Sequence, residues 1–320
     1  MTEKLTEIPG TNAQTFLDFP FADDLDDLHA DIAILGIPFG LPYQASTMAN
    51  EQSRAPDAIR GASTMDDIEY TKNHFDFDLN GHLLDGKDIK VVDCGNVVGD
   101  SADLKKHYRL AEQAARKIFS NGSTLITLGG DHGVPIPVMR ALDVFDKPIT
   151  LVQVDAHLDW RDEVNGETEG YSSPIRRASE MPWIDKIVQI GLRGIGSARA
   201  AEVADARAYG AELITAYEMH EIGMDAVLAR IPDGGPYYLT IDADGIDPTI
   251  MPAVMAQTPG GLDWIQTRQL IHGLVKKGPV LGMDLVEIAP KNDVGNITMI
   301  HAERLICNFI GATIRAGHCG

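Results

Sequence analysis

The sequence predicts an α/β protein in which one mainly parallel sheet is covered by helices on both faces. Segments with strand-like and helix-like patterns alternate along the 320 residues, which is the order that parallel βαβ units require. The strand-like runs are mostly apolar, as in strands that are buried on both faces. We see no internal repeat, low-complexity tract or convincing linker. We therefore expect a single domain over residues 1–320, with residues 1–30 as a polar, acidic N-terminal arm.

Runs of aliphatic and β-branched residues mark the expected strands. The clearest is Ile149 to Val154, because it stops abruptly at the polar segment Asp155 to Asp159. The expected strands span residues 30–37, 89–93, 124–128, 149–154, 186–190, 212–215, 237–241 and 280–286.

The expected helices lie between these strands and are marked by residues that favour helix ends. Pro56 suits the first turn of a helix, and Ser101 and Asp263 have the side chains of N-caps. The expected helices span residues 56–60, 101–120, a segment ending near 142, a segment beginning near 174, and residues 198–209, 216–230, 263–277 and 297–314. Residues 64–88 are expected to be irregular.

The composition limits the partners and the compartment. With 27 Lys and Arg against 47 Asp and Glu, the formal net charge is −20, which argues against nucleic acid or an anionic membrane surface as a partner. No window approaches the roughly 18 apolar residues of a membrane span, and the first residues lack a signal-peptide pattern. Three scattered cysteines do not predict a disulfide framework. We expect a cytoplasmic protein.

Polar side chains follow the central strand-like run where it ends. Asp155, His157 and Asp159 alternate with apolar residues, so at extended spacing their side chains leave the chain on one side. Unpaired buried charges are strongly destabilising, and a metal ion removes that penalty. These three residues alone are equally well explained as a solvated loop in an acidic chain.

Similar clusters end three other strand-like runs, at residues 129–132, 242–247 and 287. A parallel sheet brings the carboxyl ends of its strands to one edge, where open α/β sheets bind ligands. Taken singly, Asp242 and Asp244 would be explained as an Asp-rich turn, and Asp131 and Asp247 are expected to orient ligands or cap turns. Together the clusters supply two imidazoles and four carboxylates, which suit manganese, iron, nickel or zinc and balance two divalent cations. The expected metal ligands are His132, Asp155, His157, Asp159, Asp242 and Asp244.

Three blocks of the sequence resemble the signature blocks of the ureohydrolase family, which includes arginases, agmatinases and guanidino-acid hydrolases. The blocks stand in the family's order and at its spacing, and together they are highly specific, whereas any one alone is weak. The resemblance covers most of the chain, from residue 34 to residue 287, and is strongest to bacterial agmatinase-like, guanidino-compound hydrolases. The blocks are Gly129-Gly130-Asp131-His132, Asp155-Ala156-His157-Leu158-Asp159 and Asp242-Ala243-Asp244-Gly245-Ile246-Asp247-Pro248.

The resemblance implies an arginase-like, three-layer α/β/α sandwich with two metal ions, Mn²⁺ first and Ni²⁺ as the alternative. It also implies a homo-oligomer, a trimer or a hexamer, with a mixed oligomer as the alternative. By motif position, Asp155 and Asp242 would bridge the two ions. One ion would also take His132 and Asp159, and the other would also take His157 and Asp244.

The family reaction is the hydrolysis of a guanidino compound to urea and an amine, by attack of metal-bound hydroxide on the guanidinium carbon. The resemblance implies that Asp159 relays a proton to the leaving nitrogen and that Glu287 grips the guanidinium. A carboxylate suits that task, because it accepts paired N–H donors from a planar cation. The simpler interpretation of Glu287 is an ion pair at a strand end. Agmatine-like compounds, guanidino acids, small alkylguanidines and biguanides all remain candidate substrates.

The chain departs from the family after residue 159. Where many relatives have a proton-shuttling histidine, this chain has Glu169, which is either catalytic through a raised pKa or simply a loop acid. Trp160 either lines the substrate pocket or packs against a neighbouring helix. Arg161 either binds a substrate carboxylate or pairs with Asp162. Nothing resembles the arginase residues that bind an α-amino acid, so arginine is not favoured.

Two other functions compete with a guanidino-compound hydrolase. The first is a low-activity subunit that stabilises an active partner in a mixed oligomer, which the missing shuttle histidine favours and the intact ligand set opposes. The second is a two-metal phosphoesterase, which would need phosphate-binding Arg or Lys residues or a Gly-rich loop near the clusters. The sequence offers no convincing example of either.

Overall fold

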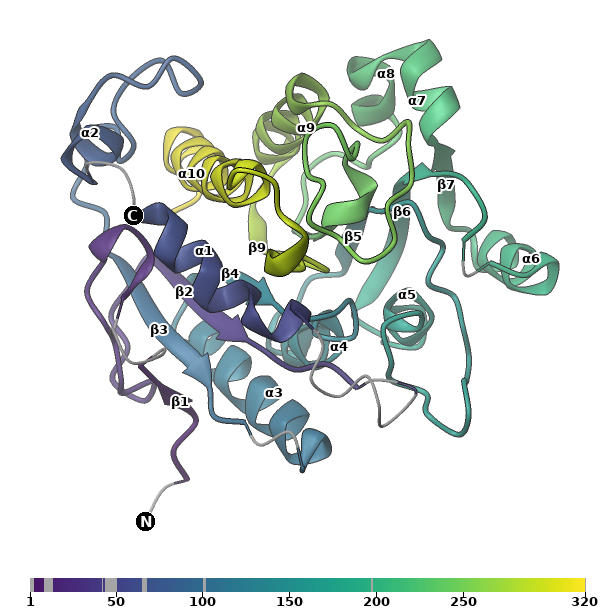
Figure 1. Ribbon diagram of the computed structural model, residues 1–320, viewed down its shortest axis with the longest axis horizontal. Coiled ribbons are helices and arrows are strands. Elements are labelled where there is room, and N and C mark those ends of the chain that lie inside the picture. The colour runs from purple at the N-terminus through teal and green to yellow at the C-terminus, as the bar shows by residue number, and fades with distance from the viewer. Residues whose placement is uncertain are drawn as a thin grey trace.

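The computed structural model describes residues 3–8, 14–41, 43, 51–64, 68–99, 102–196 and 198–319. Within them the strands form one nine-stranded sheet in the order β1-β3-β2-β4-β9-β8-β5-β6-β7 (Figure 1). All neighbouring strands are parallel except β1 and β3. The strands are β1 (Thr6–Glu7), β2 (Ile32–Ile37), β3 (Val91–Val97), β4 (Thr124–Gly129), β5 (Ile149–Val154), β6 (Ile184–Leu192), β7 (Glu212–Thr215), β8 (Tyr237–Asp242) and β9 (Val280–Val286).

Helices connect the strands and cover both faces of the sheet (Figure 1). The α-helices are α1 (Ala55–Ser63), α2 (Ile68–Asn73), α3 (Leu104–Ser120), α4 (Pro135–Arg140), α5 (Pro174–Ala178), α6 (Ala200–Tyr209), α7 (Ala216–Ile222), α8 (Met224–Ala229), α9 (Trp264–Lys277) and α10 (Ile297–Ala316). Short 3₁₀ helices are η1 (Phe16–Asp18), η3 (Glu51–Arg54), η4 (Ala141–Val144), η5 (Ala243–Gly245) and η6 (Pro290–Asn292).

Side chains of successive strand residues enter two hydrophobic clusters, one on each face of the sheet. In β2, Ile32 and Ile34 join the cluster that contains residues of α1, α9 and α10. Ala33 and Leu35 join the cluster that contains residues of α3, α4 and α5. Because both faces are covered, the interior strands are apolar and buried along most of their length. The predicted three-layer α/β/α sandwich with a mainly parallel central sheet is therefore confirmed.

Most element boundaries agree with the prediction, and β5, β7 and β9 agree at both ends. The predicted helix over residues 216–230 is divided into α7 and α8, because Gly223 lies between them with φ 77°. The segment predicted to be irregular contains the short helix α2. Helix α3 is capped by Asp103, whose side chain accepts from the Lys106 N–H; the expected cap, Ser101, lies outside the described residues.

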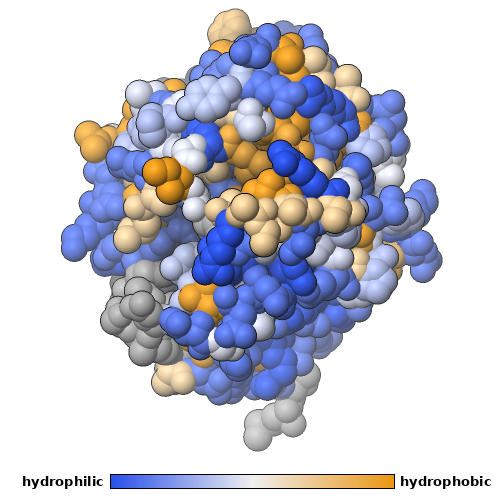
Figure 2. All heavy atoms as spheres, turned by 90° about the vertical axis from the view of Figure 1, so that its right-hand side faces the viewer, coloured by the Kyte–Doolittle hydropathy of each residue, from blue (hydrophilic) through white to orange (hydrophobic). Residues whose placement is uncertain are grey.

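The N-terminal segment adds an element that the sequence analysis did not predict. Strand β1 has two residues, too few for a periodic signal, and pairs antiparallel with β3 at the sheet edge. No helix among the described residues is both long enough and apolar enough to span a membrane. The side of the molecule near α6 and β7 is largely hydrophilic, with apolar side chains gathered near its middle (Figure 2).

Candidate functional site

The polar clusters predicted from the sequence lie at the carboxyl ends of four neighbouring strands. β4, β9, β8 and β5 occupy adjacent places in the sheet. His132 follows β4, the segment Asp155 to Asp159 follows β5, Asp242 ends β8, and Glu287 follows β9. Parallel pairing brings these ends to one edge, so side chains from distant parts of the chain meet there.

One group of side chains is centred on the imidazole of His132, which is 1% exposed. Its Nδ1 atom has no hydrogen-bond donor facing it among the described residues. Instead it faces three carboxylate oxygens, which belong to Asp155 (3.0 Å), Asp159 (2.9 Å) and Asp242 (3.1 Å). A nitrogen lone pair surrounded by carboxylates is repulsive unless a cation or a proton lies between them.

A second group is centred on His157 and shares Asp155 with the first. The Nδ1 atom of His157 lies 3.4 Å from Asp155 Oδ1 and 3.1 Å from Asp244 Oδ2. The two oxygens of Asp155 therefore face different histidines. Within the described residues, His132, Asp155 and Asp242 form one group with metal-binding spacing, and Asp155, His157 and Asp244 form another.

The other ring nitrogen of His132 fixes which of its atoms is free to bind a cation. His132 Nε2 lies 3.1 Å from Thr240 Oγ1, and that hydroxyl donates to Asp284 Oδ1 over 2.6 Å. Because the single Thr240 proton is used on Asp284, Thr240 accepts from the His132 Nε2–H. The Nδ1 lone pair of neutral His132 then points at the carboxylates. Such outer hydrogen bonds are typical of histidines that bind metals.

Buried donors hold the carboxylates in place. Asp155 accepts from Gln153 Nε2 and from the His157 N–H, each over 2.6 Å. The Asp242 Oδ1 atom accepts from the Asp244 N–H over 2.8 Å, so the turn after β8 caps itself. These contacts leave each carboxylate with further lone pairs for a cation.

The pKa shifts within the cluster also indicate that a bound positive charge would stabilise it. Burial, together with the charges of Asp244 and Asp155, raises the pKa of Asp242 well above its usual value. Burial and the charge of Asp155 raise the pKa of Asp159. Burial alone would lower the pKa of His132, but its carboxylate neighbours outweigh burial and raise it well above the ordinary value. The donor set thus fits divalent cations, which would take the place of these protons.

Two residues of the cluster have left-handed backbone conformations. Asp159 has φ 51° and Glu287 has φ 63°. This region costs about 1 to 2 kcal/mol for residues other than glycine, and such strain is common where a side chain must be aimed at a site. The conformation directs both carboxylates from the ends of their strands into the centre.

Glu287 lies beside the His132 group without belonging to either ligand group. Its Oε1 accepts from the His132 N–H over 2.8 Å, and its Oε2 accepts from Gln52 Nε2 over 2.9 Å. Burial, and then the charge of Asp131, raises the pKa of Glu287 to about 8. A cationic group at this position would stabilise the carboxylate form.

The three remaining predicted residues belong to neither ligand group. Glu169 is paired with Arg140 of α4. Trp160 is 3% exposed, belongs to the second hydrophobic cluster, and its ring lies 5.7 Å from that of Tyr209 in α6. Arg161 Nε lies 2.7 Å from Glu202 Oε1, also in α6. These contacts favour the structural interpretation that the sequence left open for each residue, with Glu202 in the place expected for Asp162.

Several residues that belong to the site escaped the sequence analysis. Gln52 contacts Glu287, and Gln153 contacts Asp155. Tyr43 and Tyr171 form a ring pair with centroids 4.7 Å apart. Burial, the neighbouring Tyr43 and then the charge of Glu287 raise the pKa of the Tyr171 phenol. Only Gln153 carried a signal, as a polar residue inside an otherwise apolar strand.

Arg193 holds the backbone around Asp244 in place, and the sequence analysis did not identify it. Its guanidinium is buried and donates to backbone carbonyls of Asp244 (2.6 Å) and Thr258 (2.7 Å). It also donates to the carbonyls of Gly191 and Gly245. The arginine therefore holds the turn that carries Asp244 against the end of β6.

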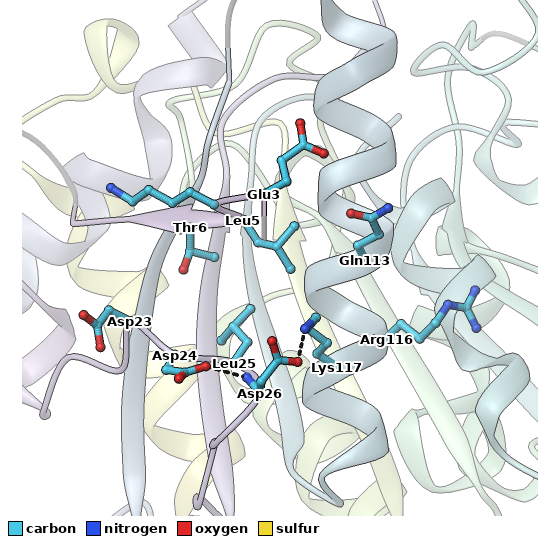
Figure 3. Close-up of a pocket in the computed structure, with 11 residues that line it drawn as sticks. Glu3, Leu5, Thr6, Asp23, Asp24, Leu25, Asp26, Gln113, Arg116 and Lys117 are labelled. Carbon is cyan, nitrogen blue, oxygen red and sulfur yellow. Dashed lines mark hydrogen bonds and ion pairs between the residues drawn. The ribbon is translucent and has the colours of Figure 1, made fainter. Parts of the chain in front are cut away.

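A cavity of about 440 Å³ lies elsewhere, between the N-terminal segment and α3 (Figure 3). Its lining includes Thr6, Leu25, Gln113 and Lys117, and Lys117 pairs with Asp26 across it. It is therefore separate from the strand-end centre, whose chemistry rests on the buried ligand groups.

The chain is similar to known proteins along most of its length. A model of the arginase family matches residues 30–311. A guanidinobutyrase from Pseudomonas aeruginosa is 31% identical over 298 residues, which cover 91% of this chain and 89% of that protein. An agmatinase from Neisseria meningitidis serogroup C is 29% identical over 277 residues, covering 85% and 83%.

A solved structure agrees with these matches. The proclavaminate amidino hydrolase from Streptomyces clavuligerus superposes with a TM-score of 0.82 at 25% identity, covering 98% of this chain and all of that one. The match to the family includes the strands that carry the ligand groups, because it extends through residues 132–287.

Proposed function

Because this chain belongs to the arginase family and is an amidinohydrolase, we propose that it cleaves a small guanidino compound to urea and an amine at the strand-end centre. The observation that carries the proposal is the pair of ligand groups that share Asp155, with the bare Nδ1 atom of His132 facing three carboxylates. Two divalent cations would stabilise such a site by offsetting the charge of its carboxylates, and without them the site is destabilised.

The proposed cations are two Mn²⁺ ions, with Ni²⁺ as the alternative. A set of carboxylates and imidazoles without thiolate supports this choice. When bound, the ions would activate water for attack on the guanidinium carbon. One ion would be held by His132, Asp155, Asp159 and Asp242. The other would be held by Asp155, His157, Asp242 and Asp244. Asp242 as a second bridging ligand is part of the proposal.

The chain's own residues would bind the substrate and move its proton. Glu287 would accept two N–H groups of the guanidinium, since it retains lone pairs beside its contacts with His132 and Gln52. Asp159 would carry a proton to the leaving nitrogen. Burial and a neighbouring negative charge raise its pKa, which suits a carboxyl group that must hold a proton briefly.

The relatives named guanidinobutyrase and agmatinase support the guanidino class of substrate. The Tyr43 and Tyr171 rings would provide an aromatic wall for an organic cation near Glu287. Arg161 is engaged by Glu202, which gives less support to a substrate with a carboxylate end. We therefore rank agmatine-like compounds and small alkylated guanidines above guanidino acids.

The assembly and the compartment are further parts of the proposal. We propose a homo-oligomer, a trimer or hexamer as the resemblance implies, in the cytoplasm. A mixed oligomer in which this chain only stabilises an active partner is the alternative, and the complete ligand set argues against it.

Urea release by the purified chain tests the proposal. The chain would be stripped of metal, reconstituted in parallel with Mn²⁺ and Ni²⁺, and offered agmatine, 4-guanidinobutyrate, methylguanidine and a biguanide. Urea from at least one compound is expected. Full metal loading without urea from any compound would contradict the proposal and favour the stabilising-subunit alternative.

A further inference from the structure

Gln52 contacts Glu287, the proposed substrate-binding residue, from a segment that is distant in the sequence. It belongs to η3, is 5% exposed, and donates from Nε2 to Glu287 Oε2 over 2.9 Å. The other oxygen of Glu287 already accepts from the His132 N–H. Gln52 therefore holds the carboxylate that would grip the guanidinium.

The other end of the Gln52 amide is an unused acceptor. Its Oε1 atom is buried and has no hydrogen-bond partner among the described residues. When a bound cation ionises Glu287, its carboxylate can only accept. The NH₂ group of Gln52 must then face it, and the carbonyl oxygen must face elsewhere. Buried acceptors in folded proteins are almost always paired, so one without a partner beside a ligand site indicates a donor supplied by the ligand.

We propose that Gln52 is a second residue that binds the guanidino group. Its Oε1 atom would require a hydrogen on the substrate nitrogen that lies beside it. This inference rests on the proposed function. Glu287 would accept along one edge of the planar cation, and Gln52 Oε1 would accept an additional N–H beside that edge. A guanidinium has more N–H donors than one carboxylate satisfies, so the two acceptors are compatible.

The arrangement makes a prediction about specificity. A substrate whose nitrogen at this position is fully alkylated has no hydrogen for Gln52 and leaves its carbonyl oxygen buried and unpaired. Sites built to hydrogen-bond a substrate group reject analogues without that group strongly. The chain should therefore favour guanidines with an unsubstituted NH₂ group at the end that Glu287 holds.

Binding of agmatine to the Mn²⁺-loaded full chain tests the role of Gln52. It is measured as the Kd by calorimetry or, where agmatine is hydrolysed, as the KM for urea release. Gln52→Met keeps the length of the side chain and removes both polar atoms, whereas Gln52→Glu keeps an acceptor and removes the donor to Glu287. Gln113→Met, at an exposed position of α3, is the matched control. Metal content and melting temperature would be measured for each variant to confirm that it is folded and loaded.

We expect Gln52→Met to raise the Kd for agmatine by roughly 10- to 100-fold, as loss of a hydrogen bond to a charged group does. Gln52→Glu should bind more tightly than Gln52→Met, and Gln113→Met should match the wild type. Equal weakening by both Gln52 variants would overturn the acceptor role, because only the contact with Glu287 would then matter. An unchanged Kd in Gln52→Met would overturn it as well. A loaded wild-type chain that neither binds agmatine nor releases urea from any guanidino compound would overturn the proposed function and this inference together.

Discussion

At the scale of single residues, Glu287 is the side chain on which substrate binding depends most in this account. It belongs to neither ligand group, has a φ of 63°, and accepts hydrogen bonds from the His132 N–H and from Gln52. Glu287→Gln should lower kcat/KM by roughly 10- to 100-fold, the effect of removing a charged hydrogen-bond partner. Metal content should stay unchanged. Loss of metal from this variant would show that Glu287 is a ligand instead.

The same residue predicts a pH dependence of stability in the metal-free protein. The pKa of Glu287 is raised from 4.5 to about 8 in the folded state. Between these values the folded chain holds a proton that the unfolded chain has lost, so stability falls as the pH rises, by up to about 1.4 kcal/mol per pH unit. Glu287→Gln should remove this contribution. Urea denaturation at pH 5, 6.5 and 8 with a chelator measures it, and equal slopes for both proteins would contradict the assignment.

Glu169 gives a third prediction at this scale. Because it pairs with Arg140, Glu169→Gln and Arg140→Met should each reduce stability by less than about 1 kcal/mol, as expected for a partly exposed ion pair. Both should leave kcat within about threefold of the wild type. A fall in kcat of about 100-fold in Glu169→Gln alone would establish it as a proton carrier after all.

At the scale of elements, Arg193 fixes the turn after β8 to the end of β6. Arg193→Met would leave several buried carbonyls unpaired at about 1 to 3 kcal/mol each, so unfolding should become easier by roughly 3 kcal/mol or more. Occupancy of the proposed ion site that includes Asp244 should also fall. Chemical denaturation and metal analysis measure both effects, and Lys105→Met, at a position whose side chain is 81% exposed, is the control. Unchanged stability would contradict the role of Arg193.

The elements also show what could be predicted from the sequence. The strands were predictable because buried parallel strands are continuous apolar runs. The meeting of the polar clusters was predictable because each cluster ends such a run, as at Asp155 and Asp242. Contacts between distant segments were not predictable. Gln52 and Arg193 act on residues far along the chain, and nothing in their own neighbourhoods indicates a partner. The substrate-binding alternatives for Trp160 and Arg161 rested on position alone, and the contacts of these residues with Tyr209 and Glu202 involve α6.

At the scale of the whole molecule, the centre is held together by strands from the middle of the sheet, so its occupancy should affect global stability. Bound cations would neutralise carboxylates that otherwise repel one another in a buried site. Free Mn²⁺ at about 100 times its Kd should stabilise the fold by about 2.7 kcal/mol for each ion bound, relative to a chelator-treated sample. Thermal melting measures this change, and Asp155→Asn should respond less. A melting temperature that changes with neither Mn²⁺ nor chelator would mean that protons, rather than cations, stabilise the cluster.

The central claim is that two cations share Asp155 at the carboxyl ends of β4, β5 and β8. The most direct test is the number of Mn²⁺ ions per chain after reconstitution and removal of free metal, measured by elemental mass spectrometry against protein concentration. The account predicts two ions in the wild type and fewer than one in Asp155→Ala. A wild-type chain that saturates with one ion or none would contradict it.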